Sequence, residues 1–258
     1  MKIKWLVLIG VFTFIIAATA MIPATSVEAS INQRISKIGV LRVTGGTIWS
    51  GQGTLELKQG RTRQMEAFVT WSFAPLSLLS ARIGFDITAA GADVNGKARV
   101  ALGLASAKIS ATEVATTFEA LNRFSPFLAM MRVGGEVQLR AGDAPLTIEY
   151  AAPHDASGTL KATTSKLKIR TIGNDTLGRF SATFTANKQN IAYKIDDSNG
   201  LLTLNGGGNI SRSNPREFRY VGNANVSRAT PAWLTAGLIT VGKPSLDGRI
   251  QIDYKFNF

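Results

Sequence analysis

Cysteine is absent from the 258 residues, and histidine occurs only once. The absence of cysteine excludes disulfides, thiolate metal sites and cysteine catalysis. Aromatic residues are also few, at 8%, and charged residues make up 18%, whereas hydrophobic residues reach 45%. This balance argues against a disordered chain. Together with 25 glycines, it predicts a lightly packed domain with many turns.

Acidic residues are scarce relative to basic ones, 17 against 29, so the net charge is +12. Such an excess favours anionic partners such as phospholipid headgroups. The basic residues form no single block but alternate with apolar ones, as in residues 166–170 (KLKIR). A solvated strand face explains that alternation, and a surface that faces lipid headgroups is the alternative. We expect no nucleic-acid partner.

Charged residues are missing from Trp5 to Ile22, a run that is almost wholly apolar. The run is just long enough to cross a bilayer, which needs about 17–25 residues. The basic flank at residues 1–4 places that end in the cytoplasm. A signal peptide cleaved before Ser30 is the alternative, although the run exceeds the usual signal core of about 7–15 residues. We therefore expect a retained single-pass anchor at 5–22, a linker at 23–36 and a periplasmic β-rich domain at 37–258.

Apolar and polar residues alternate through most of the chain after residue 38. The alternation is clearest in residues 83–87, 137–139, 180–186 and 250–256. One apolar and one polar face are typical of an antiparallel sheet that is half-exposed to water. Glycines before several of these segments supply turns. The pattern predicts a mainly β domain built as a large antiparallel meander.

Two short helices are expected within the sheet. Ser110 and Glu113 form a capping-box pattern that predicts a helix from Ser110 that ends or kinks at Pro126. The second helix is expected to start at Thr230, with Pro231 in its first turn, and to stop near Gly242. Its apolar residues would pack on the sheet: Trp233, Leu234, Leu238 and Val241.

Residues that could carry chemistry have simpler structural explanations. His154 lies in a loop-like segment without an oriented nucleophile, so it predicts no serine triad. The oxygen-rich segment 196–200 (DDSNG) lacks the spacing of a calcium loop and is typical of a turn. The glycine clusters at 45–46 and 206–208 are not followed by the residues of a phosphate loop. We expect no catalytic residue, no metal site and no cofactor.

Five segments carry a resemblance to a known family. A turn at 46–51 (GTIWSG) is followed by 69–79 (VTWSFAPLSLL), 197–206 (DSNGLLTLNG), 231–238 (PAWLTAGL) and 248–252 (GRIQI). In this order and spacing, the chain resembles the type II secretion system protein N family. The resemblance implies a bitopic inner-membrane accessory subunit of the machinery that exports folded proteins across the outer membrane. It also implies contacts with other subunits of the inner-membrane platform and a large curved antiparallel sheet.

The segments around the two early tryptophans are the candidate structural or interaction motif. Its residues are Gly46, Thr47, Trp49, Gly51, Trp71 and Pro75. Packing in the core at the start of the sheet explains both tryptophans. Placement at the membrane interface is the functional alternative, since an indole has an apolar ring and an N–H donor. The alternative function is a periplasmic β groove that binds or handles lipid, which the one-sided apolar sheet and the positive charge favour.

Overall fold

The computed structural model describes residues 13–14, 18–36, 38–59, 62–124, 126–151, 156–170, 175–187, 190–211, 217–226, 230–246 and 248–257. The fold of these residues is mainly β, a large antiparallel sheet with few and short helices, as the alternation predicted. The chain divides into two compact units, residues 1–95 and 96–258.

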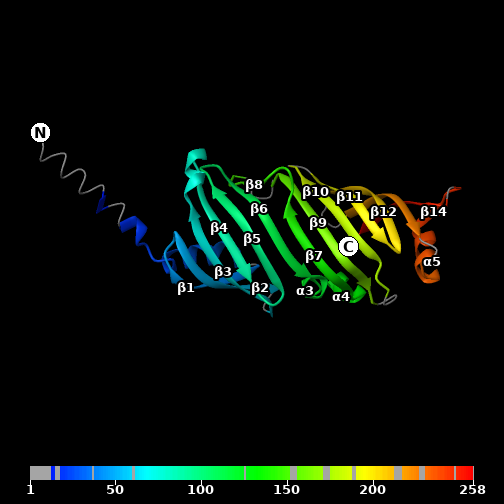
Figure 1. The fold of residues 1–258 in the computed structure, drawn as a ribbon, viewed down its shortest axis with the longest axis horizontal. Helices are drawn as coiled ribbons and strands as arrows, with labels where there is room; N and C mark the ends of the chain where they lie inside the picture. Colours follow the sequence, from blue (N-terminus) through cyan, green and yellow to red (C-terminus); the bar gives the residue numbers. More distant parts are fainter. Residues whose placement is uncertain are drawn as a thin grey trace, which may run out of the picture. The chain divides into compact units, whose positions relative to one another are not determined.

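The first unit is an antiparallel meander in which each strand pairs with the next along the chain (Figure 1). The apolar residues that alternate along its third strand, among them Met65, Ala67 and Val69, are buried. In chain order its elements are helix α2 (Thr25–Ile35), strands β1 (Gly39–Gly46), β2 (Ser50–Gln59) and β3 (Thr62–Ala74), the 3-10 helix η1 (Pro75–Ser80) and strand β4 (Ile83–Ala90).

Helix α2 lies inside the segment that was expected to be a linker, residues 23–36. It packs against β1, the first strand of the meander. Ala24, immediately before α2, is fully buried. The residues that follow the expected anchor are therefore part of the first unit's fold.

The second unit continues the antiparallel pattern. Its strands follow the order β6-β7-β9-β10-β11-β12-β13-β15-β14, and β8 pairs with β6. Strand β5 (Val94–Leu102) begins at the end of the first unit, and its residues from Gly96 onward belong to the second. The remaining strands are β6 (Ser106–Thr117), β7 (Val133–Ala141), β8 (Leu146–Glu149), β9 (Gly158–Ile169), β10 (Gly178–Ala186), β11 (Asn190–Gly200), β12 (Leu202–Ser211), β13 (Glu217–Val226), β14 (Gly242–Pro244) and β15 (Ile250–Asn257).

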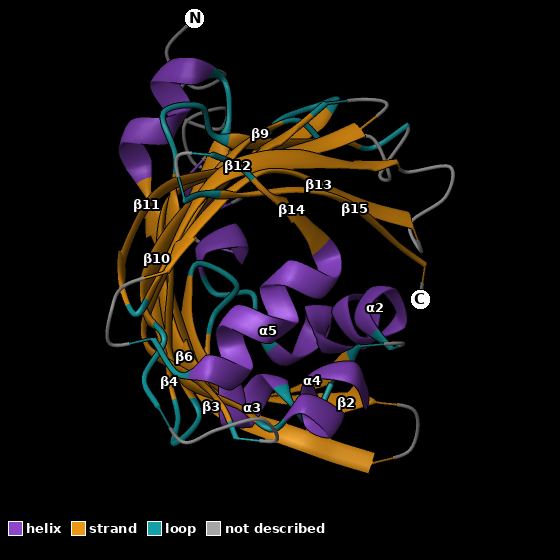
Figure 2. Ribbon diagram, turned by 90° about the vertical axis from the view of Figure 1, so that its right-hand side faces the viewer, coloured by secondary structure: helices purple, strands orange, loops and turns teal. Residues whose placement is uncertain are grey.

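Helix α5 (Ala232–Val241) packs on the apolar face of the last strands, and Figure 2 shows β9 to β15 curving around it. The helix starts at Ala232, two residues after the predicted Thr230, so Pro231 occupies the N-cap position and not the first turn. It ends before Gly242, as predicted. Leu234 and Leu238 are buried in the core of the unit, and Trp233 packs against that core. The other buried members of this core are Leu177, Tyr193, Leu202, Tyr220, Ala224, Ile250 and Ile252.

The helix predicted from Ser110 is wrong over its first turns. Strand β6 runs to Thr117, and Glu113 and Val114 pair with Arg140 and Leu139 of β7. Tertiary pairing overrides the local capping pattern here. The helical turn α3 (Phe118–Leu121) begins only after Thr117, whose hydroxyl accepts a hydrogen bond from Ala120 N. Pro126 starts helix α4 (Pro126–Met131) instead of ending the first helix.

The turn predicted at 196–200 is also misplaced. Strand β11 continues to Gly200 because β10 pairs with it as far as Gly178. Gly200 has φ +144°, so the chain reverses between it and Leu202, the first residue of β12.

The expected membrane anchor falls mostly outside the described residues, which include only 13–14 and 18–22 of the segment 5–22. Among the helices that the structure describes, none has both the length and the apolar character needed to span a bilayer.

Candidate functional site

The tip of the β1–β2 hairpin brings most of the candidate motif together. Gly46 ends β1 with φ +96°, a conformation that glycine adopts without strain. The Thr47 hydroxyl accepts hydrogen bonds from the backbone N–H groups of Trp49, at 3.3 Å, and Ser50, at 3.2 Å. Thr47 N in turn donates to Ser50 O at 2.8 Å. Each polar residue of the turn therefore stabilises a fixed tip geometry.

Trp71 of β3 lies directly opposite Gly51 of β2 in the antiparallel pairing of these two strands. A Cβ atom on Gly51 would collide with Cζ2 of Trp71, so only glycine leaves room for the indole. The indole N–H of Trp71 donates to Thr47 O at 3.3 Å. This pairing of an aromatic ring with a cross-strand glycine ties the third strand to the tip.

Trp49 connects the hairpin tip to the chain segment that precedes α2 and β1. Its indole N–H donates to Thr19 O at 2.8 Å, and its ring meets that of Phe73 edge-on at 5.3 Å between centroids. Trp49 O also accepts a hydrogen bond from Phe73 N at 2.7 Å. Both tryptophans are only partly buried. Their N–H groups bind backbone carbonyls, so they pack at the rim of the sheet and not in a closed core.

Residues 22–24 add backbone contacts to the same tip. Ala24 N donates to Gly46 O at 3.1 Å, and Ile48 N donates to Ile22 O at 3.1 Å. Pro23 forms an isolated antiparallel bridge with Thr47. Residues 22–24 therefore bind the hairpin like a short extra strand, although no feature of their sequence predicted it.

Helix α2 continues this cover along the outer edge of β1. The Asn32 carboxamide donates to Leu41 O at 2.8 Å and accepts from Leu41 N at 2.7 Å. Glu28 accepts a hydrogen bond from Val43 N at 3.2 Å. These contacts occupy backbone groups that an edge strand otherwise offers to another chain.

Pro75 is the one candidate residue that does not join the hairpin tip. It opens η1, immediately after β3. Three leucines of η1 are exposed: Leu76 by 77%, Leu78 by 55% and Leu79 by 88%. The sequence could not reveal this exposure, because an apolar run next to a strand predicts buried side chains.

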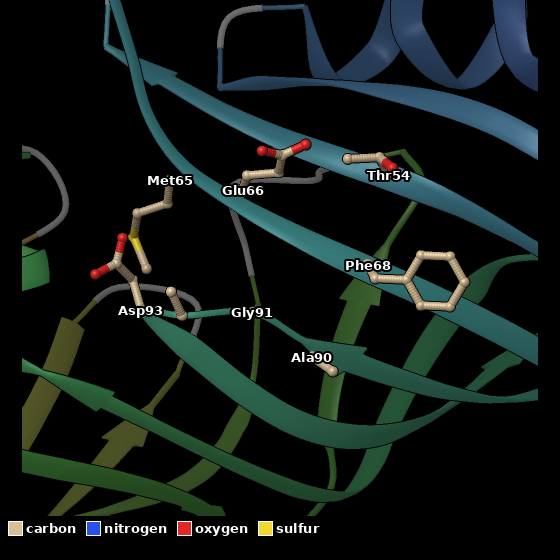
Figure 3. A pocket seen from close by; sticks show the side chains of 8 residues that line it. Thr54, Met65, Glu66, Phe68, Ala90, Gly91 and Asp93 are labelled. Carbon is tan, nitrogen blue, oxygen red and sulfur yellow. The ribbon is translucent and has the colours of Figure 1, made fainter.

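Described residues of the first unit line at least two hollows. One, of about 510 Å³, is lined by Gly46, Gly51 and Trp71 of the motif together with neighbouring polar side chains. The other, of about 570 Å³, lies beside Glu66, Phe68 and the turn at Gly91–Asp93. Figure 3 shows that the carboxylates of Glu66 and Asp93 do not point toward each other there. Neither lining has the convergent titratable groups of a catalytic site.

Carboxylates with a lowered pKa sit in surface ion pairs of the second unit. Hydrogen bonds from the Arg219 guanidinium, at 2.8 and 2.9 Å, hold the pKa of Asp253 below its ordinary value. Lys97, at 3.3 Å, does the same for the pKa of Glu113. Groups that stay ionised are poor general acids near neutral pH. The described residues contain no cluster of three or more possible metal ligands, and His154 lies outside them.

Comparison with known proteins matches the chain to a family model. No curated protein and no solved structure matches the chain. The family model for protein N of the type II secretion system matches residues 40–253, most of the chain but neither the expected anchor nor α2. That range contains the hairpin tip, Trp71, η1 and α5. The chain belongs to the type II secretion system protein N family.

Proposed function

We propose that this chain is a non-enzymatic accessory subunit of the type II secretion machinery. Residues 5–22 anchor it once in the inner membrane, with the N-terminus in the cytoplasm and the β body in the periplasm. It acts by contact with other subunits of the inner-membrane platform while folded proteins are exported. Membership of the protein N family supports the role in type II secretion.

The observation that carries the proposed architecture is the docking of residues 19–24 on the hairpin tip. Trp49 binds Thr19, and the backbone of Gly46 binds Ala24. A cleaved leader has no need of such contacts with the mature fold. The alternative cleavage point before Ser30 would also cut within α2, whose Glu28 binds Val43 N. These contacts favour a retained anchor over a removed signal peptide.

Contact with subunits fits the second unit better than lipid handling does. At the last strands, acyl chains would compete with α5, which packs on the apolar face there through Leu234 and Leu238. The polar faces and edges of the strands remain for protein contacts. Native mass spectrometry of the purified full-length chain distinguishes the two, because a lipid-handling protein would retain phospholipid after detergent removal.

Deletion of the chromosomal gene and purification of a tagged chain test the proposal. Deletion should reduce the export of folded exoproteins, and a tagged chain should co-purify with inner-membrane platform subunits. Normal export without the gene, together with no co-purifying secretion component, would contradict the proposed role.

A matched pair of variants examines the hairpin tip. Trp49→Ala loses both the Phe73 contact and the bond to Thr19, whereas Trp49→Phe keeps a ring and loses only the N–H donor. We expect a larger export defect in Trp49→Ala than in Trp49→Phe, at equal protein levels. Wild-type export in both variants would show that the hairpin tip has no role in export.

A further inference from the structure

The 3-10 helix η1 has no charged residue, although Arg82 follows it, and it exposes leucines at the end of the sheet where residues 19–24 dock. Strand register pairs Ser50 with Ser72, and η1 begins three residues beyond Ser72. Trp49 contacts Phe73 on one side and Thr19 on the other. The exposed Leu76, Leu78 and Leu79 therefore lie on the same end of the unit as the docked residues 19–24.

Both side-chain hydroxyls of η1 donate hydrogen bonds to backbone carbonyls of the same loop or of the residue before it. The Ser77 and Ser80 hydroxyls donate to Ala74 O at 2.6 Å and to Ser77 O at 2.8 Å. Ala81 N donates to Leu78 O at 2.9 Å, and Ala81 has φ +52°, which closes the turn. A loop with internally bonded polar groups can leave water at low cost, since unsatisfied groups are what apolar surroundings penalise.

The loop is also held rigidly against β4. The Ser77 side chain packs so closely on Gly84 that a Cβ atom there would overlap it. The leucines thus project from a fixed platform. The strands that flank η1 carry aromatic rings: Phe73 of β3 and Phe85 of β4 are in edge-on contact, with 6.3 Å between their centroids. Tryptophan and apolar side chains at one end of a domain are typical of a surface that meets the bilayer interface.

We propose that Leu76, Leu78 and Leu79 insert into the outer-facing leaflet of the membrane that holds the anchor. The loop and the anchor then form two attachment points that fix the orientation of the first unit on the membrane. A lipid bilayer is the occupant that the geometry favours, because the apolar chain segment that precedes Thr19 leads to this end of the unit. The inference rests on the proposed anchor at residues 5–22.

Single-cysteine labelling of the full chain tests the insertion, since the chain contains no cysteine. Leu79→Cys carries an environment-sensitive fluorophore in vesicles of phosphatidylethanolamine and phosphatidylglycerol. Ala92→Cys, in the exposed turn at the far end of β4, is the matched control, and Phe14→Cys reports on the anchor. Quenching is measured with nitroxide lipids inside the bilayer and with iodide in the water.

The label at 79 should show blue-shifted emission, strong quenching by nitroxide lipid and several-fold weaker quenching by iodide than the label at 92. Adding Leu76→Ser and Leu78→Ser should restore iodide quenching of the label at 79 and abolish its quenching by nitroxide lipid. Iodide access at 79 equal to that at 92, with the label at 14 in lipid, overturns the insertion alone. Shielding from iodide without nitroxide quenching assigns the loop to a protein contact and also overturns it. A water-exposed label at 14 overturns the anchor and the insertion together.

Discussion

The carboxamide of Asn32 pairs with both backbone groups of Leu41, as a neighbouring strand would. Asn32 belongs to α2 and Leu41 to the outer strand β1. One side chain thereby replaces a missing strand residue at the edge of the first unit. This explains how α2 covers an edge that could otherwise recruit another chain.

Asn32→Ala should loosen this edge. Loss of two hydrogen bonds to a partly buried backbone costs about 1–3 kcal/mol. Hydrogen exchange measured by mass spectrometry should therefore accelerate in peptides that cover Gly39–Gly46. Gln33→Ala, at the exposed neighbouring position of α2, is the control and should leave exchange unchanged. Equal protection in both variants would show that α2 contributes nothing through Asn32.

Gly51→Ala should displace the indole of Trp71. The new methyl group would collide with the ring and would lie 2.9 Å from Gly45 O. Overpacking of this kind typically costs about 1–3 kcal/mol. The thermal midpoint of the first unit, followed by tryptophan fluorescence, should fall. Gly45→Ala is the matched control, because no atom lies within 4 Å of a Cβ placed there. A midpoint unchanged in Gly51→Ala would contradict the close packing.

Thr47→Val should weaken the hairpin tip at nearly constant volume. The hydroxyl that accepts the N–H groups of Trp49 and Ser50 is lost, and each hydrogen bond contributes about 0.5–1.5 kcal/mol. Thr47→Ser keeps the hydroxyl and should behave like the natural chain. Proteolysis of the segment around residues 19–24 by a nonspecific protease measures the effect. Susceptibility that is equal in Val and Ser variants would assign the threonine to packing alone.

Alkaline pH should destabilise the second unit once the pH exceeds the ordinary pKa of a tyrosine phenol. Burial, and then the neighbouring Tyr220, raises the pKa of Tyr193, and burial raises the pKa of Tyr220. Both phenols are neutral in the folded state at a pH where those of the unfolded chain, with a pKa of about 10, ionise. Stability is therefore fully present below about pH 10 and falls as the pH rises further.

Urea denaturation between pH 8 and pH 12 measures this decline. The double variant Tyr193→Phe, Tyr220→Phe should lose most of the decline, although it also loses the hydrogen bond from Tyr193 to Arg219 O. The exposed Tyr254→Phe should retain it. An identical decline in the double variant and the natural chain would refute the role of the buried phenols.

The sequence predicts the strands well wherever one face is buried. The alternation at residues 180–186 and 250–256 falls within β10 and β15, where Phe180, Phe184, Ile250 and Ile252 pack in or against the core of the second unit. Helix α5 was equally visible, since Pro231 and Gly242 mark its ends. The helix expected from Ser110 failed because strand pairing with β7 decides that segment.

The site was predictable in part. The glycines and tryptophans of the motif stood out, and the hairpin gathers all of them, while Pro75 starts a separate loop. The roles of Asn32, Glu28 and Thr19 could not be read from the sequence, because their partners are backbone groups of β1 and the hairpin tip. Only the folded register brings those groups within reach.

The most direct test of the account is the topology of the intact chain, measured with a membrane-impermeant maleimide on single-cysteine variants in spheroplasts. We predict that Ala92→Cys is labelled in intact spheroplasts, that Lys2→Cys is labelled only after permeabilisation, and that the mature chain keeps residues 1–29. Labelling of Lys2→Cys from outside, shielding of Ala92→Cys, or a mature mass that lacks the N-terminal segment would contradict it.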